Sequence, residues 1–272
     1  MPLASIPEWF AVIILGIIEG ATEFLPISST GHLLIPQNLG WLPKQSDLFD
    51  VVIQSGAVIA VLAVFGVRLK QMAGSLGDPK TRDYLLKLLV AFVVTAAGGL
   101  VLKKLNIKLP ETIPPVAWAT LIGGLVIFWV EFMRKGKHGV DHLTWTVVIA
   151  IGLAQLLAAV FPGTSRSGAS IIVALAFGIA RPAATEFSFL LGVPTLLAAG
   201  AFKILVAVKE HQMGQEKWGM VLLATVVSAL SAFLVVKWLI RFVQSHTFNG
   251  FAIYRVLLGV GLLVYVAMAK AP

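Results

Sequence analysis

Long apolar runs separated by short polar loops dominate the pattern along the chain. Six of these runs are long enough to cross the roughly 30 Å hydrocarbon core of a bilayer as helices. They extend over Leu48 to Val67, Leu85 to Leu102, Val116 to Phe132, Phe187 to Val208, Met220 to Ile240 and Phe251 to Met268. The pattern therefore predicts an all-α integral membrane protein with six transmembrane helices.

Two further apolar stretches are interrupted. The stretch from Trp9 to Gly40 is broken at Pro26, and the stretch from Leu143 to Ile179 is broken at Pro162. Backbone that leaves a helix at membrane depth is tolerated only where it is buried in protein or faces a water-filled cavity. We therefore expect two re-entrant hairpins, each made of a helix, a break and a shorter helix, at about residues 9–40 and 143–179.

The two breaks resemble one another, because each has a proline followed by hydroxyl residues and a glycine. They read Pro26-Ile27-Ser28-Ser29-Thr30-Gly31 and Pro162-Gly163-Thr164-Ser165-Arg166-Ser167-Gly168. Each hairpin is followed by three spans, and because three is odd the second half enters the membrane inverted relative to the first. The sequence predicts a single membrane domain, residues 1–272, built from inverted repeats at 1–133 and 142–272.

Composition narrows the class of protein and the chemistry. With 58% hydrophobic and 12% charged residues, the chain does not fit a water-soluble domain. It has no cysteine, which excludes disulfides, thiolate metal sites and a cysteine nucleophile. The formal charge of +8 comes from basic residues in short loops, so their expected partners are membrane lipids and not nucleic acid.

Lysine and arginine are more frequent in the loops after the first, third and fifth spans than on the opposite side. Short cytoplasmic loops carry this excess in membrane proteins. We therefore expect both termini to lie outside the cytoplasm. The first hairpin then enters the membrane from the outer side and the second from the inner side.

Glu19, Glu23 and Arg255 lie within apolar runs, where ionisable groups are costly and commonly mark a functional site. Glu19 and Glu23 are four residues apart, so they share one face of a helix. Two adjacent carboxylates need a cation or a shared proton, unless both lie at a water interface at the end of a short helix. Arg255, in the last span, needs a partner that the sequence does not identify.

The first break has the composition of an anion site. Pro26 ends one helix, and Ser28, Ser29 and Thr30 stand where the next begins. Their hydroxyls and the free backbone N–H groups of the helix start could bind a phosphate, or the hydroxyls could be plain N-caps. His32 lies within one turn of Ser29, where an imidazole can accept a proton from a hydroxyl or give one to a leaving group.

The second break adds a permanent positive charge. Arg166 stands at the start of another short helix, and its planar guanidinium matches phosphate oxygens. It could instead be a structural counter-ion of the two carboxylates. Thr164, Ser165, Ser167 and Gly168 are the further groups expected to bind phosphate here. Together the two breaks predict a site for a phosphate-bearing anion at membrane depth.

At these residues the chain resembles the undecaprenyl-pyrophosphate phosphatases of the bacitracin-resistance family. The motifs are the second break and the run Glu19-Gly20-Ala21-Thr22-Glu23-Phe24-Leu25-Pro26-Ile27-Ser28-Ser29-Thr30-Gly31-His32, and the span pattern fits along the entire chain. The phosphatidic-acid type of membrane phosphatase has a His and an Asp downstream of its Ser-Arg pair. Ser165-Arg166 has no such partners, so that assignment fails.

The resemblance implies hydrolysis of the C55 carrier undecaprenyl pyrophosphate to its monophosphate, which recycles the carrier for peptidoglycan synthesis. It also implies assistance by Mg²⁺ or Ca²⁺, with Glu19 and Glu23 as candidate ligands of the cation. The expected location is the bacterial inner membrane, with the site open to the periplasmic side. The expected partners are the lipid substrate, membrane lipids and a second copy of the chain in a homodimer.

Two versions of the chemistry stay open at this point. In one, Ser29 attacks the terminal phosphorus, His32 accepts its proton, and the phosphoserine is then hydrolysed. In the other, His32 or a metal-bound water attacks and Ser29 only binds. In both, Arg166 and the helix N-termini stabilise charge on the phosphoryl oxygens. The alternative function is a transporter or flippase for an anionic lipid carrier, which needs the arginine and the helix ends but not the Ser-His pair.

Overall fold

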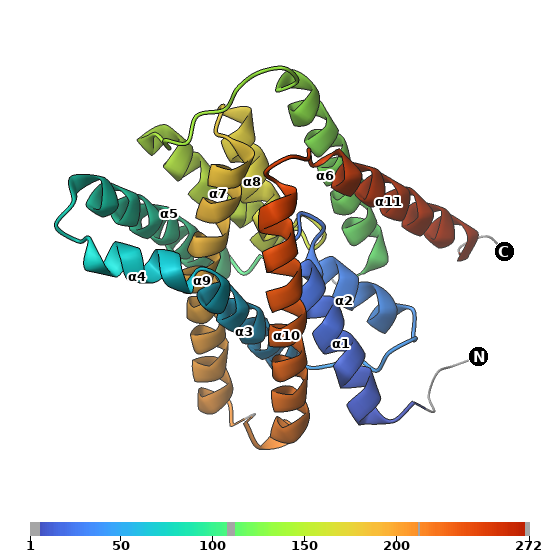
Figure 1. The fold of residues 1–272 in the computed structure, drawn as a ribbon. Helices are drawn as coiled ribbons and strands as arrows, with labels where there is room; N and C mark the ends of the chain where they lie inside the picture. Colours follow the sequence, from blue (N-terminus) through green and yellow to red (C-terminus); the bar gives the residue numbers. More distant parts are fainter. Residues whose placement is uncertain (1–5, 108–111, 212, 270–272) are drawn as a thin grey trace.

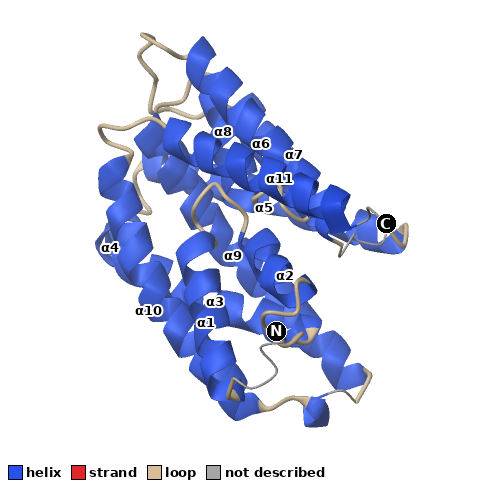
Figure 2. Cartoon of the chain, turned by 90° about the vertical axis from the view of Figure 1, so that its right-hand side faces the viewer, coloured by secondary structure: helices blue, strands red, loops and turns tan. Residues whose placement is uncertain are grey.

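The computed structural model describes residues 6–107, 112–211 and 213–269. Within these ranges every regular element is a helix, and the only β-type pairing is a single bridge between Val140 and Ile179. Figure 2 shows the helices joined by short loops. The predicted all-α class is confirmed.

The helices follow the predicted pattern. In the first half they are α1 (Glu8–Thr22), α2 (Ser29–Asn38), α3 (Asp47–Val64), α4 (Gly66–Gly74), α5 (Pro79–Lys104) and α6 (Ile113–Met133). In the second half they are α7 (Trp145–Val160), α8 (Arg166–Ala176), α9 (Arg181–Lys209), the 3-10 helix η1 (Met213–Gln215), α10 (Trp218–Phe242) and α11 (Asn249–Ala269). Among the described residues six helices are long and apolar enough to span a membrane, namely α3, α5, α6, α9, α10 and α11. These are the six predicted spans.

The end of the first span differs from the sequence expectation. The first span was expected to run to Val67, but α3 ends at Val64 and a separate helix, α4, begins at Gly66. Most of α4 is exposed and only Met72 is buried in it. The first span therefore ends about one turn before the predicted end at Val67, and the rest of the apolar run belongs to the start of α4.

Both interrupted stretches form a helix, a break and a shorter helix, as expected, and this is compatible with re-entrant hairpins. The breaks share an uncommon backbone conformation, since Ser28 and Ser165 have φ angles of 75° and 71°. In each break the serine Oγ accepts a hydrogen bond from the N–H three residues later, at Gly31 and Gly168. Positive φ is uncommon for residues other than glycine. The two breaks therefore share both an unusual serine conformation and the same N-cap hydrogen bond.

Helix packing brings elements of the two halves together. α6 lies beside α11, α10 packs against both α1 and α3, and α5 packs against α7 (Figures 1 and 2). The α10 contacts are close, because a Cβ at Gly20 would lie 2.1 Å from the Ser228 carbonyl oxygen and one at Gly56 would lie 2.2 Å from that of Thr225. Small residues allow this approach of membrane helix backbones.

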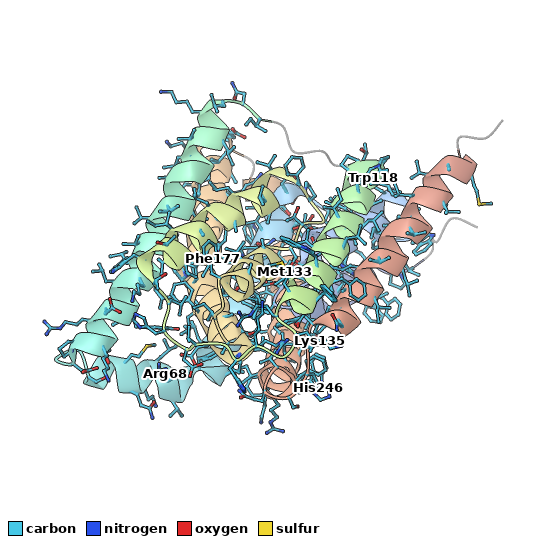
Figure 3. The ribbon with its side chains drawn as sticks, turned by 90° about the horizontal axis from the view of Figure 1, so that it is seen from above. Arg68, Trp118, Met133, Lys135, Phe177 and His246 are labelled. Carbon is cyan, nitrogen blue, oxygen red and sulfur yellow. The ribbon has the colours of Figure 1, made fainter. Side chains whose placement is uncertain are left out.

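Charged side chains gather at the helix ends. Arg181 pairs with the buried Glu131, which also accepts a hydrogen bond from the Phe248 N–H. Figure 3 labels Arg68, Lys135 and His246, which lie in the segments after α3, α6 and α10. These segments are predicted to be cytoplasmic, and that orientation stays a prediction. The two terminal residues, whose location outside the cytoplasm was also predicted, lie outside the described residues.

Candidate active site

The two breaks are in direct contact, although they lie more than a hundred residues apart in the chain. The Ser165 and Ser167 hydroxyls both donate to the Leu25 carbonyl, at 3.2 and 3.0 Å. A Cβ at Gly168 would lie 3.2 Å from the Pro26 Cα, so the backbones almost touch. The side chains of both breaks therefore belong to one site.

Glu23 joins the two breaks at their centre. Its Oε2 accepts a hydrogen bond from the Ser29 hydroxyl, and its Oε1 accepts one from Arg166 Nη2 at 2.9 Å. All three side chains are largely buried. Ser29 and Arg166 are the first residues of α2 and α8, so two helix N-termini converge on one carboxylate. Arg166 thus orients a potential proton acceptor toward a potential nucleophile.

Arg166 keeps hydrogen-bonding capacity for a ligand. Its Nε and Nη1 are buried without an acceptor in the part of the chain that the structure describes. The guanidinium lies over Gly192 of α9, where a Cβ would be 2.7 Å from Nη1, and its Cζ is 5.7 Å from the centre of the Phe24 ring. Planar N–H donors held in this way can bind phosphoryl oxygens.

A cavity of about 180 Å³ lies against these groups. Residues of both breaks line it: Glu23, Ser28, Ser29, Thr30, Pro162, Ser165 and Arg166. Its other walls include polar residues that the sequence reasoning missed, namely Gln54 of α3, Thr95 of α5, Gln155 of α7 and Thr195 of α9. One signal was present, because Gln155 precedes the second break at nearly the spacing with which Glu19 precedes the first.

His32 faces away from Ser29. Its Nδ1–H donates to the Ser28 carbonyl at 2.7 Å, and its Nε2 accepts from the Tyr254 hydroxyl at 2.6 Å. The Nδ1 must carry the proton because a carbonyl only accepts. Both ring nitrogens are therefore engaged, and the Ser29 hydroxyl donates to Glu23 instead. Ser29 and His32 were expected to share a proton, but the structure shows no hydrogen bond between their side chains.

The remaining residues expected to bind phosphate have different surroundings. Thr30 is exposed and lines the central cavity. Ser167 is fully buried, and its hydroxyl binds backbone carbonyls. Thr164 and Gly168 line a separate lateral cavity, and the Thr164 carbonyl accepts a hydrogen bond from Arg255. Much of the second break thus serves to hold the first in place.

The carboxylates fit a divalent cation only in part. Glu19 is fully buried, and both its oxygens are without a hydrogen-bond partner among the described residues. Both oxygens of Glu23 are occupied by Ser29 and Arg166. No group of three His, Cys, Asp or Glu residues within the described ranges could hold a metal. Of the two predicted ligands only Glu19 has uncommitted oxygens, and a hard cation such as Mg²⁺ would need other oxygen ligands as well.

Comparison with known proteins agrees with this geometry. Residues 12–261 match the family described as Bacitracin resistance protein BacA. The chain is 48% identical to an undecaprenyl-diphosphatase of Rhizobium etli over 257 residues, which cover 94% of this chain and 96% of the relative. It is 46% identical to an undecaprenyl-diphosphatase of Xanthomonas oryzae pv. oryzae over 263 residues, covering 96% and 98%. The chain therefore belongs to the BacA bacitracin-resistance family.

Proposed function

We propose that this chain is a membrane phosphatase that hydrolyses undecaprenyl diphosphate to undecaprenyl phosphate and inorganic phosphate. The observation that carries the proposal is the Glu23 carboxylate, which joins Ser29 of one break to Arg166 of the other beside a cavity. Near full-length relatives at 46–48% identity bear the name of this activity. Product release returns the carrier lipid for cell-wall synthesis.

The chemistry that best fits the contacts uses Ser29 as nucleophile and Glu23 as general base. The Ser29 oxygen bonds to the terminal phosphorus, its proton passes to Glu23, and the anhydride bond breaks to release undecaprenyl phosphate. Glu23 then gives up that proton to the departing undecaprenyl phosphate. Water attacks the phosphoserine phosphorus while Glu23 accepts a proton from the water. The P–O bond to Ser29 breaks, Glu23 returns the proton to the Ser29 oxygen, and inorganic phosphate leaves. The proposal replaces His32 with Glu23 as the proton acceptor, because only Glu23 binds the Ser29 hydroxyl.

Charge on the transferring phosphoryl group is stabilised by Arg166 and by the N-termini of α2 and α8. The unpartnered Nε–H and Nη1–H of Arg166 supply donors, and the two helix dipoles place positive potential at the same point. Thr30 is the exposed hydroxyl at the cavity that can add a further hydrogen bond. Preorganised donors of this kind contribute the largest part of phosphoryl-transfer catalysis.

His32 supports the start of α2. Its bond to the Ser28 carbonyl holds the cap residue next to Ser29, while Tyr254 fixes the tautomer of the imidazole. We therefore assign His32 a positioning role. It acts on the orientation of Ser29 and not on its proton.

We also propose that Glu19 holds the divalent cation, Mg²⁺ or Ca²⁺. Glu19 lies one helical turn before Glu23 in α1, and both its oxygens are buried without a hydrogen-bond partner among the described residues. The cation would neutralise charge on the diphosphate. A loss of the divalent-cation requirement in a Glu19→Gln variant that binds substrate normally would support this assignment.

Three residues that line the central cavity support an opening toward the predicted outer side of the membrane. Gln54 lies in the first half of α3, whereas Thr95 and Ala199 lie in the last halves of α5 and α9. On the predicted orientation these three halves all point outward. We propose that the protein is in the bacterial inner membrane with this cavity open to the periplasm. The homodimer stays a prediction.

Release of inorganic phosphate by purified protein in detergent tests the function. Arg166→Ala should reduce turnover about 100- to 1,000-fold, as loss of one strong oxyanion partner does, and Arg166→Lys should restore only part of it. The exposed Arg82→Ala is the matched control and should remain near wild type. Folded wild-type protein that releases no phosphate would instead favour a lipid transporter, since transport needs two compartments and hydrolysis does not.

A further inference from the structure

Arg255 is almost fully buried in α11, yet all of its hydrogen-bonding capacity is used. Its guanidinium makes five hydrogen bonds, each to a backbone carbonyl. They run from Nη1 to Pro26 (2.9 Å) and Thr164 (3.1 Å), from Nη2 to Gly163 (2.9 Å) and Ala119 (3.1 Å), and from Nε to Thr120 (3.2 Å). A guanidinium has five N–H donors, so none is left for another partner.

The acceptors explain why an arginine lies here. Pro26 belongs to the first break, and Gly163 and Thr164 belong to the second. Carbonyls at a helix break lack intrahelical partners, and at membrane depth no bulk water replaces those partners. No carboxylate forms an ion pair with Arg255 in the described ranges, so carbonyl dipoles compensate its charge.

The neighbouring helix α6 leaves room for this guanidinium at Gly123. A Cβ at Gly123 would lie 1.9 Å from Arg255 Nη2 and 2.6 Å from Cζ. Any larger residue would push the end of the arginine side chain away from the two breaks. The position of the guanidinium is thus fixed by both helices of the α6 and α11 pair.

Binding of these carbonyls also orients the opposite side of each peptide. In a trans peptide the C=O and the following N–H point in opposite directions. With the Thr164 carbonyl held by Arg255, the Ser165 N–H points away from Arg255, and Ser165 lines the central cavity. By the same reasoning the Ile27 N–H, which follows the Pro26 carbonyl, points away from Arg255, and it donates to the Leu25 carbonyl within the first break.

We infer that Arg255 is a positioning residue that holds the carbonyl sides of both breaks and thereby sets Ser29 and Arg166 opposite each other. It does not touch the substrate. The geometric part of the inference stands on the hydrogen bonds alone, and its consequence for turnover rests on the proposed function.

Two substitutions test this role in different ways, because one removes the guanidinium and the other moves it. Arg255→Lys keeps the charge but has three donors in place of five and lacks the planar fork, so it loses at least two of the five hydrogen bonds and the fixed geometry that spans both breaks. Gly123→Ala keeps the arginine and moves its end group. Gly261→Ala, on the lipid-exposed part of α11 with open space around it, is the matched control. We expect turnover to fall by up to roughly 100-fold in the first two, the scale of a misplacement of about 1 Å, and to stay unchanged in the control.

A second readout does not depend on activity. Because the chain has no cysteine, Thr30→Cys and Ala159→Cys can be introduced as a pair, one from each half of the chain, at two residues that line the central cavity. A short thiol-specific cross-linker then reports the juxtaposition of the breaks. We expect the cross-linking yield to fall in the Arg255→Lys and Gly123→Ala backgrounds and to be preserved in the Gly261→Ala background.

Chemical rescue separates positioning from folding. Arg255 lines the lateral cavity of about 600 Å³ between α6, α7 and α8, so a small cation can reach its place. Guanidinium added to folded Arg255→Ala protein should raise turnover and cross-linking together with a saturable dependence, whereas sodium should raise neither. If Arg255→Ala does not fold, the Arg255→Lys and Gly123→Ala variants carry the test.

The outcomes distinguish the two claims. Reduced cross-linking together with reduced turnover supports the inference. Reduced cross-linking in a protein whose wild type releases no phosphate supports the positioning role and refutes the proposed function. A cross-linking yield equal to that of the wild type in both Arg255→Lys and Gly123→Ala overturns the positioning role. If the same two variants release phosphate normally, the proposed function still stands.

Discussion

Glu23 accepts hydrogen bonds from the first residues of two different helices, and this single carboxylate defines the site at the residue scale. Ser29 and Arg166 come from separate breaks and meet only at its two oxygens. Removing any one of the three leaves a buried polar partner unpaired, which is costly at low dielectric. The three side chains should therefore behave as one unit in substitution experiments, with non-additive effects.

Gly192 tests how closely the position of Arg166 controls turnover. A Cβ there would lie 2.7 Å from Nη1, at the flexible end of the arginine, so Gly192→Ala should fold and displace the guanidinium. We expect a loss of turnover of up to about 100-fold. Gly200→Ala, two turns later in α9 with open space, should match wild type. Equal turnover in the two variants would show that this placement of Arg166 is not needed.

The sequence identified the charged residues of the site but not all of their partners. Glu23 and Arg166 stand out because ionisable groups are rare in apolar runs. The helical spacing of Ser29 and His32 predicts that they are near each other, but not the direction of either side chain. Tertiary neighbours decide that, and Tyr254 is 222 residues from His32 in the chain. The partners of Arg255 are carbonyls, which every residue carries and no sequence pattern marks.

At the scale of elements, the two halves use equivalent helices in equivalent ways. α1 packs on α10 of the other half, α7 packs on α5, and α6 pairs with α11. Ser28 and Ser165 have the same cap geometry and precede Ser29 and Arg166 at matching positions. We propose on these grounds that residues 1–133 and 142–272 are inverted repeats. Equivalent positions then carry a nucleophile in one half and a cation in the other.

Most of the element pattern could be predicted, because a membrane span needs a long apolar run and the six runs stand out. The breaks were equally visible at Pro26 and Pro162, where helices cannot continue unaltered. The end of α3 and the start of α4 could not be predicted from the sequence. Apolar residues continue to Val67, and only packing decides where such a helix bends.

Close packing of α1 on α10 predicts a large effect on stability at Gly20. A Cβ there would lie 2.1 Å from the backbone oxygen of Ser228, and backbone does not move aside as a side chain does. Gly20→Ala should lower the free energy of unfolding by about 1–3 kcal/mol, as overpacking does. Gly261→Ala should be neutral or stabilising by up to about 1 kcal/mol. Thermal unfolding in one detergent measures both, and equal stability would refute the close packing.

At the scale of the whole molecule, the surface is that of a protein surrounded by lipid. Phe132, Met268 and Leu257 are 78%, 72% and 68% exposed, whereas Glu19 and Arg255 are buried. In these residues apolar side chains lie on the surface and charged side chains in the interior, the opposite of a soluble protein, as the composition predicted. Buried polar side chains include those at the meeting point of the breaks, Glu131 at a helix end, and others within spans, such as Ser228 of α10.

The proposed inverted topology places the ends of α2 and α8 on opposite sides of the membrane. Trp41 and Phe177 are exposed just after these helices. In intact cells, a membrane-impermeant thiol reagent should label Trp41→Cys and should label Phe177→Cys only after the membrane is opened. Labelling of both from one side would contradict the inverted repeat. The reverse pattern would contradict only the orientation.

The most direct test of the central claim is to follow the phosphate during one turnover. Undecaprenyl diphosphate labelled with ³²P at its terminal phosphate is mixed with the enzyme, and the reaction is stopped within a single turnover. We predict labelled protein with the phosphate on Ser29, less label in Glu23→Gln because the proton acceptor is lost, and none in Ser29→Ala. A Ser29→Ala enzyme that still releases phosphate at the wild-type rate would contradict the account.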